Sequence, residues 1–142
     1  MKTSPPHHFA NGVAPNHVHV SDIGTIYFYQ HCVVGEFNEG VNVSYATGFT
    51  LLLTCLKHIG TKPVYLISNR INSYSVQPND YKYLTKVPNL KGIAVVTKDP
   101  VGAANARLEA EFFKKSFEVF NDIDQAKAWG DKLIASYLVK SK

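Results

Sequence analysis

The sequence has few cysteines and no long apolar run, and each of these absences excludes a class of protein. Two cysteines, Cys32 and Cys55, occur among 142 residues, so a disulfide-stabilised secreted scaffold is excluded. Both lie in apolar segments without the spacing of a metal site, and we expect reduced core residues. No apolar run approaches the roughly 20 residues that a membrane-spanning helix needs. The start of the chain, MKTSPPHH, has no apolar stretch behind Lys2, which favours a cytoplasmic protein over a secreted one.

The motifs of common enzymes and metal sites are also missing. The chain contains no GxSxG turn, no Walker loop, no GxGxxG fingerprint, and neither HExxH nor CxxC. His17 and His19 are two positions apart and would share one face of a strand, but no third ligand stands at a fixed spacing from them. We therefore expect a non-catalytic protein that binds no metal and no cofactor.

The basic character of the chain raises the question of nucleic-acid binding. The net charge is +4 and the isoelectric point is near 9.0. All basic residues except Arg70 and Arg107 are lysines, and only Lys114 and Lys115 are adjacent to each other. Proteins that bind nucleic acids usually concentrate basic residues along one groove or helix. The scattered lysines therefore indicate a solvated surface and no nucleic-acid partner.

The pattern of apolar residues in the sequence changes near residue 18. Residues 1–17 contain Pro5, Pro6 and Pro15 and no periodic apolar pattern, so we expect a flexible tail that folding does not require. Residues 18–142 are expected to form a single domain. Its first segments are rich in β-branched and aromatic side chains and are joined by short turns, which is typical of an antiparallel hairpin or meander: residues 18–20, 25–29 and 32–37.

The rest of the domain carries the signals of about four helices. Apolar residues recur at helical spacing over residues 45–59, between Ser44, a suitable N-cap, and Gly60, which ends the segment. Three further helices begin at favoured start signals, which are Pro78, Asp99 followed by Pro100, and Asp122 with Gln125. In the third of the four helices, the apolar residues predicted to face the core are Val101, Ala104, Leu108 and Phe112.

Apolar strands separate these helices. Residues 63–67 and 92–97 are continuous apolar runs, so we expect them to be inner strands that are covered on both faces. Residues 117–120 form a further short strand. Strands that alternate with helices need crossover connections, which make this part of the sheet largely parallel. The predicted fold class is α/β, with one mixed sheet, an N-terminal antiparallel hairpin, parallel inner strands and about four helices.

Three segments carry a resemblance to a known family: GTIYFYQHCVVGEFNEG at residues 24–40, PVYLISNRINSYSVQPNDYKYL at residues 63–84, and FEVFNDIDQAKAWGDKL at residues 117–133. Over about residues 18–138 the order of elements resembles the STAS fold of anti-sigma-factor antagonists and of the cytoplasmic tails of sulfate transporters. In particular it is similar to bacterial STAS/SEC14-like proteins of unknown function. The resemblance implies a regulatory module that binds a protein partner.

The chain departs from this family at the regulatory loop. Phosphorylatable members present an Asp-Ser-Ser-Gly-type loop at the start of the helix after the third strand, whereas this sequence reads SYSVQP at residues 73–78. Ser75 lies near the corresponding place without the neighbouring Asp or Gly. We therefore expect that the phosphorylation switch is absent.

The polar loop between the strand at residues 63–67 and the helix at Pro78 is the candidate binding surface. Loops at the carboxyl ends of parallel strands meet at one edge of an open sheet, where ligands bind. Arg70 has a planar guanidinium that suits a carboxylate or a phosphate. The alternative is that the polar side chains of the loop pair locally and satisfy its carbonyls. The residues of this surface are Ser68, Asn69, Arg70, Asn72, Ser73, Tyr74, Ser75 and Asp80.

Two functions therefore remain open. The first is a non-catalytic interaction or regulatory module that works through residues 68–80, as the STAS resemblance implies. The second is a small-molecule or lipid carrier that uses an apolar pocket between the sheet and the helices, as the SEC14-like resemblance implies. A homodimer is compatible with both functions.

Overall fold

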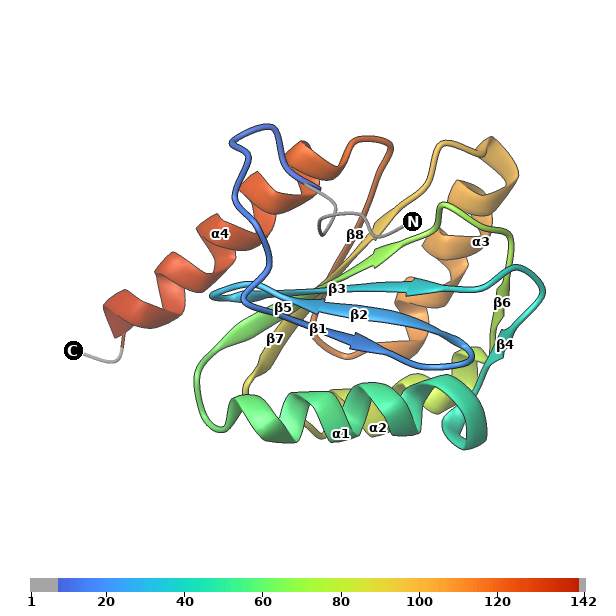
Figure 1. Ribbon diagram of the computed structural model, residues 1–142, viewed down its shortest axis with the longest axis horizontal. Coiled ribbons are helices and arrows are strands. Elements are labelled where there is room, and N and C mark those ends of the chain that lie inside the picture. Colours follow the sequence, from blue (N-terminus) through green and yellow to red (C-terminus); the bar gives the residue numbers. More distant parts are fainter. Residues whose placement is uncertain (1–7, 141–142) are drawn as a thin grey trace, which may run out of the picture.

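A six-stranded sheet in the order β1-β2-β3-β5-β7-β8 runs through the middle of the protein (Figure 1). The computed structural model describes residues 8–140. The first three strands pair antiparallel, and β3, β5, β7 and β8 pair parallel, which confirms the predicted mixed sheet. The strands are β1 (His17–Val20), β2 (Gly24–Phe28), β3 (Cys32–Phe37), β5 (Val64–Asn69), β7 (Leu90–Val96) and β8 (Ser116–Phe120).

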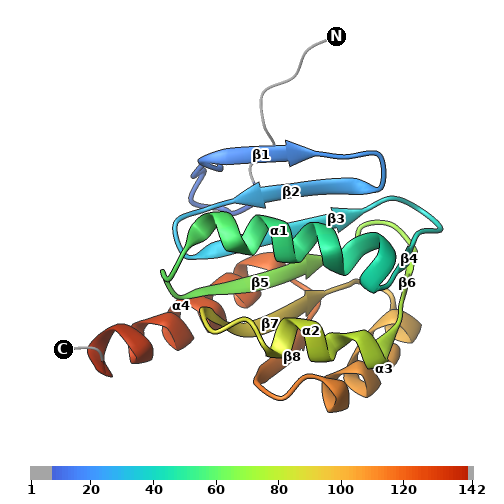
Figure 2. The ribbon, with the colours of Figure 1, turned by 90° about the horizontal axis from the view of Figure 1, so that it is seen from below.

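Within residues 8–140, four α-helices cover the two faces of the sheet. α1 (Thr50–Ile59) and α2 (Tyr81–Thr85) lie on one face, and α4 (Ile123–Lys140) lies on the other (Figures 1 and 2). α3 (Pro100–Glu109) packs against β7 and β8 and buries Ala106 in the same core as α1 and α2. Short helical turns complete the chain: the π-helical η1 (Tyr45–Phe49) and the 3-10 turns η2 (Pro78–Asp80) and η3 (Ala110–Phe112).

The helix boundaries follow from local chemistry that the sequence contains. The Asp99 side chain accepts hydrogen bonds from the backbone N–H groups of Val101 and Gly102, and Asp122 accepts one from Gln125. Gly60 ends α1 with φ of 79°, a conformation that favours glycine. The predicted helix at residues 45–59 is present, but its first turn is π-helical and only the remainder is α-helical.

The inner strands alternate between two apolar cores, as strand geometry requires. Val33 and Leu66 point into the core under α1 and α2, whereas Val34, Tyr65 and Ile67 point into the core under α4. β5 and β7 lie between other strands and are buried along most of their length, which confirms both predicted inner strands. Cys32 and Cys55 are both free and buried, in agreement with the sequence-based expectation.

α4 approaches the sheet closely because one of its residues lacks a side chain. A Cβ atom at Gly130 would lie 2.2 Å from the Tyr65 ring, which is far below a van der Waals contact. Tyr65 is fully buried there, and its hydroxyl donates a hydrogen bond to the Asp131 carboxylate at 2.9 Å. The glycine therefore sets the distance between α4 and β5.

A small second sheet and the first described residues lie outside the main sheet. β4 (Asn42–Val43) pairs in parallel with β6 (Ser75–Val76) in a separate two-stranded sheet. Residues 8–16 pack on the α4 face of the main sheet, where the Phe9 side chain is only 3% exposed. Of the expected flexible tail, residues 1–7 lie outside the described residues, whereas Phe9 is buried and His17 belongs to β1.

This N-terminal arm, residues 8–16, is held by polar contacts as well as by Phe9. The two ring nitrogens of His8 lie 2.5 Å from the Tyr29 hydroxyl and 2.9 Å from a Glu36 carboxylate oxygen. Sequence patterns did not reveal the arm, because a single aromatic residue among prolines has no periodicity. Between residues 8 and 140, no helix is long and apolar enough to cross a membrane.

Candidate functional site

The predicted polar loop borders a groove beside α3, which we call the α3 groove. Residues 70–78 form one wall, and α3 with η3 forms the other. The volume of the groove is about 610 Å³, within the range of about 300–1,000 Å³ that is common for binding sites. Of the predicted surface residues, the groove is lined by Arg70, Asn72, Ser73, Tyr74 and Ser75, but not by Ser68, Asn69 or Asp80.

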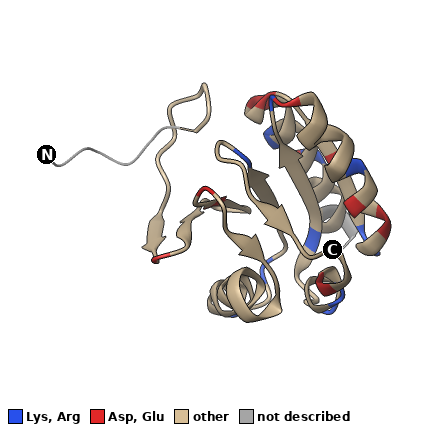
Figure 3. Ribbon diagram, turned by 90° about the vertical axis from the view of Figure 1, so that its right-hand side faces the viewer, with Lys and Arg blue, Asp and Glu red and all other residues tan. Residues whose placement is uncertain are grey.

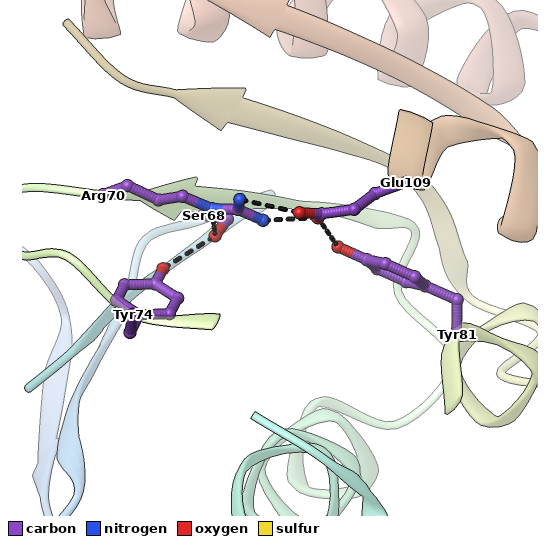
Figure 4. A network of polar contacts seen from close by, with 5 residues as sticks. All are labelled: Ser68, Arg70, Tyr74, Tyr81 and Glu109. Atoms are coloured by element: carbon purple, nitrogen blue, oxygen red, sulfur yellow. Dashed lines mark hydrogen bonds and ion pairs between the residues drawn. The ribbon is translucent and has the colours of Figure 1, made fainter. Parts of the chain in front are cut away.

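Arg70 lies in the floor of this groove and is already paired. Two guanidinium nitrogens donate to the two carboxylate oxygens of Glu109, at 3.0 and 2.6 Å (Figure 4). The Tyr81 hydroxyl donates to the same carboxylate at 2.7 Å. Burial disfavours the charged guanidinium, but Glu109 outweighs this effect and raises the pKa of Arg70. A bidentate, charge-assisted pair of this kind holds α3 against the end of β5.

The network continues from Arg70 toward Tyr74. The Arg70 Nε donates to the Ser68 hydroxyl at 3.3 Å, and that hydroxyl shares a hydrogen bond with the Tyr74 hydroxyl at 3.0 Å (Figure 4). The guanidinium carbon also lies 5.5 Å from the centre of the Tyr74 ring, within the range of a cation–π contact. These contacts fix the polar loop to the end of β5 and leave the Arg70 charge directed at Glu109.

The other predicted residues also make local contacts. Asn72 donates from its side-chain amide to the Phe37 carbonyl oxygen at 3.0 Å, and Asp80 accepts from the backbone N–H of Tyr45 at 2.8 Å. The Ser73 backbone N–H donates to the Glu39 carboxylate at 2.8 Å. These contacts match the alternative in which the polar side chains of the loop pair locally.

Asn69 lies apart from this groove, whereas Ser75 lines it from the small sheet. Asn69 points to the opposite face of the sheet, where its amide donates to the Glu36 carboxylate at 2.8 Å. The Ser75 hydroxyl donates to the Asn42 side chain at 2.9 Å across the small sheet. Ser75 therefore lines the groove from a strand rather than from the start of a helix.

The feature that sequence reasoning missed is an apolar rim on the α3 groove. Ile71 and Val101 are both 66% exposed, Leu108 is 64% exposed and Phe112 is 41% exposed, and all four line the groove. The prediction that Val101, Ala104, Leu108 and Phe112 face the core is wrong: all four are exposed, and Ala106 and Glu109 occupy the buried side of α3. Periodicity detected the apolar stripe correctly but not the direction in which it faces.

The charged groups of the groove are engaged with one another or with backbone. Its two lining carboxylates are Asp99, which caps α3, and Glu109, which holds Arg70. The groove therefore presents four exposed apolar side chains, and the Arg70 and Glu109 charges beneath them neutralise each other. This arrangement suits contact with an apolar surface of another molecule.

Comparison with known proteins supports the fold. Neither a family model nor a curated protein matches the sequence. A similar solved structure is that of an uncharacterized protein of the DUF3478 family from Shewanella loihica PV-4, which is described as having a SpoIIAA-like fold. The two chains are 16% identical, the match covers 83% of this chain and 98% of that chain, and the TM-score is 0.50. The protein therefore has a SpoIIAA-like, or STAS-like, fold.

Proposed function

We propose that the protein is a non-catalytic interaction module of STAS type that binds a protein partner through the α3 groove. The observation that carries this proposal is the outward direction of the apolar stripe on α3. Nine large apolar side chains are exposed among the described residues, and four of them line this one groove. Clustered exposed apolar side chains are a mark of protein interaction sites.

The energetics favour an interface at this place. Burial of one leucine or isoleucine side chain contributes about 1.5–3 kcal/mol, so Ile71 and Leu108 alone offer a substantial gain to a partner that covers them. The Arg70–Glu109 pair beneath them is already neutralised, so a partner need not supply a counter-ion for it. A partner segment with apolar side chains and few charges is the best match to this surface.

The position of Ser75 supports a module without the phosphorylation switch. Ser75 lies in the strand β6 and not at the N-terminus of an α-helix. Its hydroxyl donates a hydrogen bond to the Asn42 side chain. A phosphate at this position would therefore not gain the stabilisation that a helix N-terminus gives to an anion. In this proposal, the protein acts by binding or releasing its partner at the α3 groove, and not by phosphorylation of Ser75.

The experiment is affinity capture with three forms of the protein as bait. The Leu108→Glu variant places a charge on the rim of the groove, and because the Leu108 side chain is 64% exposed we expect the variant to fold. The matched control is Val20→Glu, which changes a 74% exposed apolar residue on the edge strand β1. We expect a partner that binds the wild type and the Val20→Glu control but not the Leu108→Glu variant. Equal capture by all three forms, at equal melting temperatures, would contradict the proposal.

A further inference from the structure

A second cleft lies away from the α3 groove, between the edge strand β1 and helix α1. Its volume is about 550 Å³, which is again in the range of small-molecule sites. α1 lies across the central strands, and β1 is at the far edge of the sheet (Figure 2). The cleft therefore opens where the helix leaves the edge of the sheet uncovered.

The inner wall of this cleft is apolar. Leu51, Cys55 and Ile59 follow one another at intervals of four residues, so they lie on one side of α1. Phe28 of β2 contributes an aromatic side chain to the same cleft. Leu51, Ile59 and Phe28 are each partly buried, so they keep apolar surface available for a ligand.

The rim of the cleft is basic. His17 and His19 are two positions apart on β1 and share one side of the strand, and His58 lies in the last turn of α1. Lys62 completes this rim from the loop that follows α1. None of the described residues that line the cleft is acidic. Figure 3 shows that charged residues gather on the helices on the right of that view, whereas the outer strands on the left carry few.

A metal ion is not the occupant that this arrangement favours. Within residues 8–140, no three histidine, cysteine or acidic side chains come close enough together to hold a metal ion. The nitrogen donors are instead distributed along the rim, beside an apolar wall. A carboxylate can accept several separate hydrogen bonds from imidazole and ammonium groups, so spread donors suit it.

We propose that this cleft binds a small amphipathic carboxylate, such as a single-chain fatty acid of medium length. The hydrocarbon chain would pack on Leu51, Ile59 and Phe28, and the carboxylate would lie toward His58 and Lys62. Cavity volume, apolar wall, basic rim and absence of lining carboxylates all point to the same chemistry. The site is separate from the α3 groove and does not depend on the function proposed for that groove.

Calorimetric titration with three probes tests this ligand chemistry. Decanoate has both the chain and the charge, decanol has the chain alone, and acetate has the charge alone. We expect decanoate to bind with a dissociation constant below about 1 mM, and each of the other probes to bind at least about tenfold more weakly. Absence of decanoate binding, or equal binding of acetate or decanol, would overturn the proposal.

Variants then locate the site. Thr54 is exposed on α1 and lines the cleft, so Thr54→Trp should fill it and abolish decanoate binding. The double variant His58→Ala/Lys62→Ala should weaken decanoate binding by about tenfold or more and leave decanol binding unchanged. Lys132→Ala, at an exposed position on α4, is the matched control and should bind decanoate as the wild type does.

The outcomes separate this site from the α3 groove. The Leu108→Glu variant should retain full decanoate binding even if its partner is lost. Circular dichroism of each variant shows whether it is folded, and the double variant on the exposed rim keeps the test valid if Thr54→Trp does not fold. Unchanged decanoate binding in the double variant would place the ligand elsewhere and refute the proposal.

Discussion

The buried Arg70–Glu109 pair leads to a quantitative prediction about two substitutions, of which the second is added to a protein that already carries the first. Both side chains are almost fully buried, at 8% and 9% exposure, and the carboxylate also accepts the Tyr81 hydroxyl. Glu109→Leu leaves the Arg70 guanidinium without a counter-ion. Breaking a buried pair in this way costs about 3–5 kcal/mol, since the remaining charge is buried and unpaired.

A second substitution in the same protein should restore part of this loss. Arg70→Met, added to Glu109→Leu, removes the unpaired charge and leaves only the Tyr81 hydroxyl without its acceptor. An unsatisfied buried hydroxyl costs about 1–3 kcal/mol. The double variant should therefore be more stable than the single Glu109→Leu variant by about 2 kcal/mol. Two independent destabilising substitutions would instead add their effects.

Urea unfolding followed by tryptophan fluorescence measures these differences. The chain has one tryptophan, Trp129, whose ring lies 5.9 Å from that of Phe120 in the core under α4, so its emission reports on folding. The total stability of such a domain is about 5–15 kcal/mol, so the single variant remains measurable if the wild type lies in the upper part of this range. Further destabilisation by Arg70→Met in the Glu109→Leu background would refute the coupling of the two residues.

Three further predictions concern the face of the sheet under α4. Phe9→Ala should lower the free energy of unfolding by about 3–5 kcal/mol, because the ring is buried; an unchanged urea midpoint would instead support the hypothesis of a dispensable tail. Burial alone would raise the pKa of Glu36, but hydrogen bonds from His8 and Asn69 outweigh it and lower the pKa in the folded state. The unfolded state therefore binds more protons near pH 4, so stability should fall as the pH drops below about 4.3, and Glu36→Gln should flatten this part of the profile. Gly130→Ala should lower the melting temperature, because overpacking costs about 1–3 kcal/mol, and an unchanged value would show that α4 moves freely away from the sheet.

The sequence predicted those features whose causes are local or repeat at short intervals. The helix starting at Asp99 was predictable because the capping side chain bonds to backbone groups two and three residues later. The inner strands were predictable because an unbroken apolar run, such as residues 92–97, needs cover on both faces. The STAS-like fold was expected because the order of these elements resembles that family.

The remaining features depend on contacts between distant residues. Arg70 and Glu109 are 39 positions apart, so no local sequence pattern around Arg70 identifies Glu109 as its partner. The stripe of α3 was visible, but small residues such as Ala106 take its buried side and the larger apolar residues line the groove. Helical periodicity gives the existence of a stripe, and only the packing of the whole chain gives its direction.

The docking of the N-terminal arm on α4 has a consequence for the order in which the protein is completed during synthesis. The Ala10 backbone N–H donates to Asp124, which is 114 positions later, and the Lys127 ammonium lies 5.6 Å from the centre of the Phe9 ring. A ribosome releases the arm before α4, so these contacts of the arm cannot form until α4 has emerged. A nonsense mutation or proteolytic cut that removes α4 would therefore also remove these contacts of the arm and leave it held by the contacts of His8 with Tyr29 and Glu36.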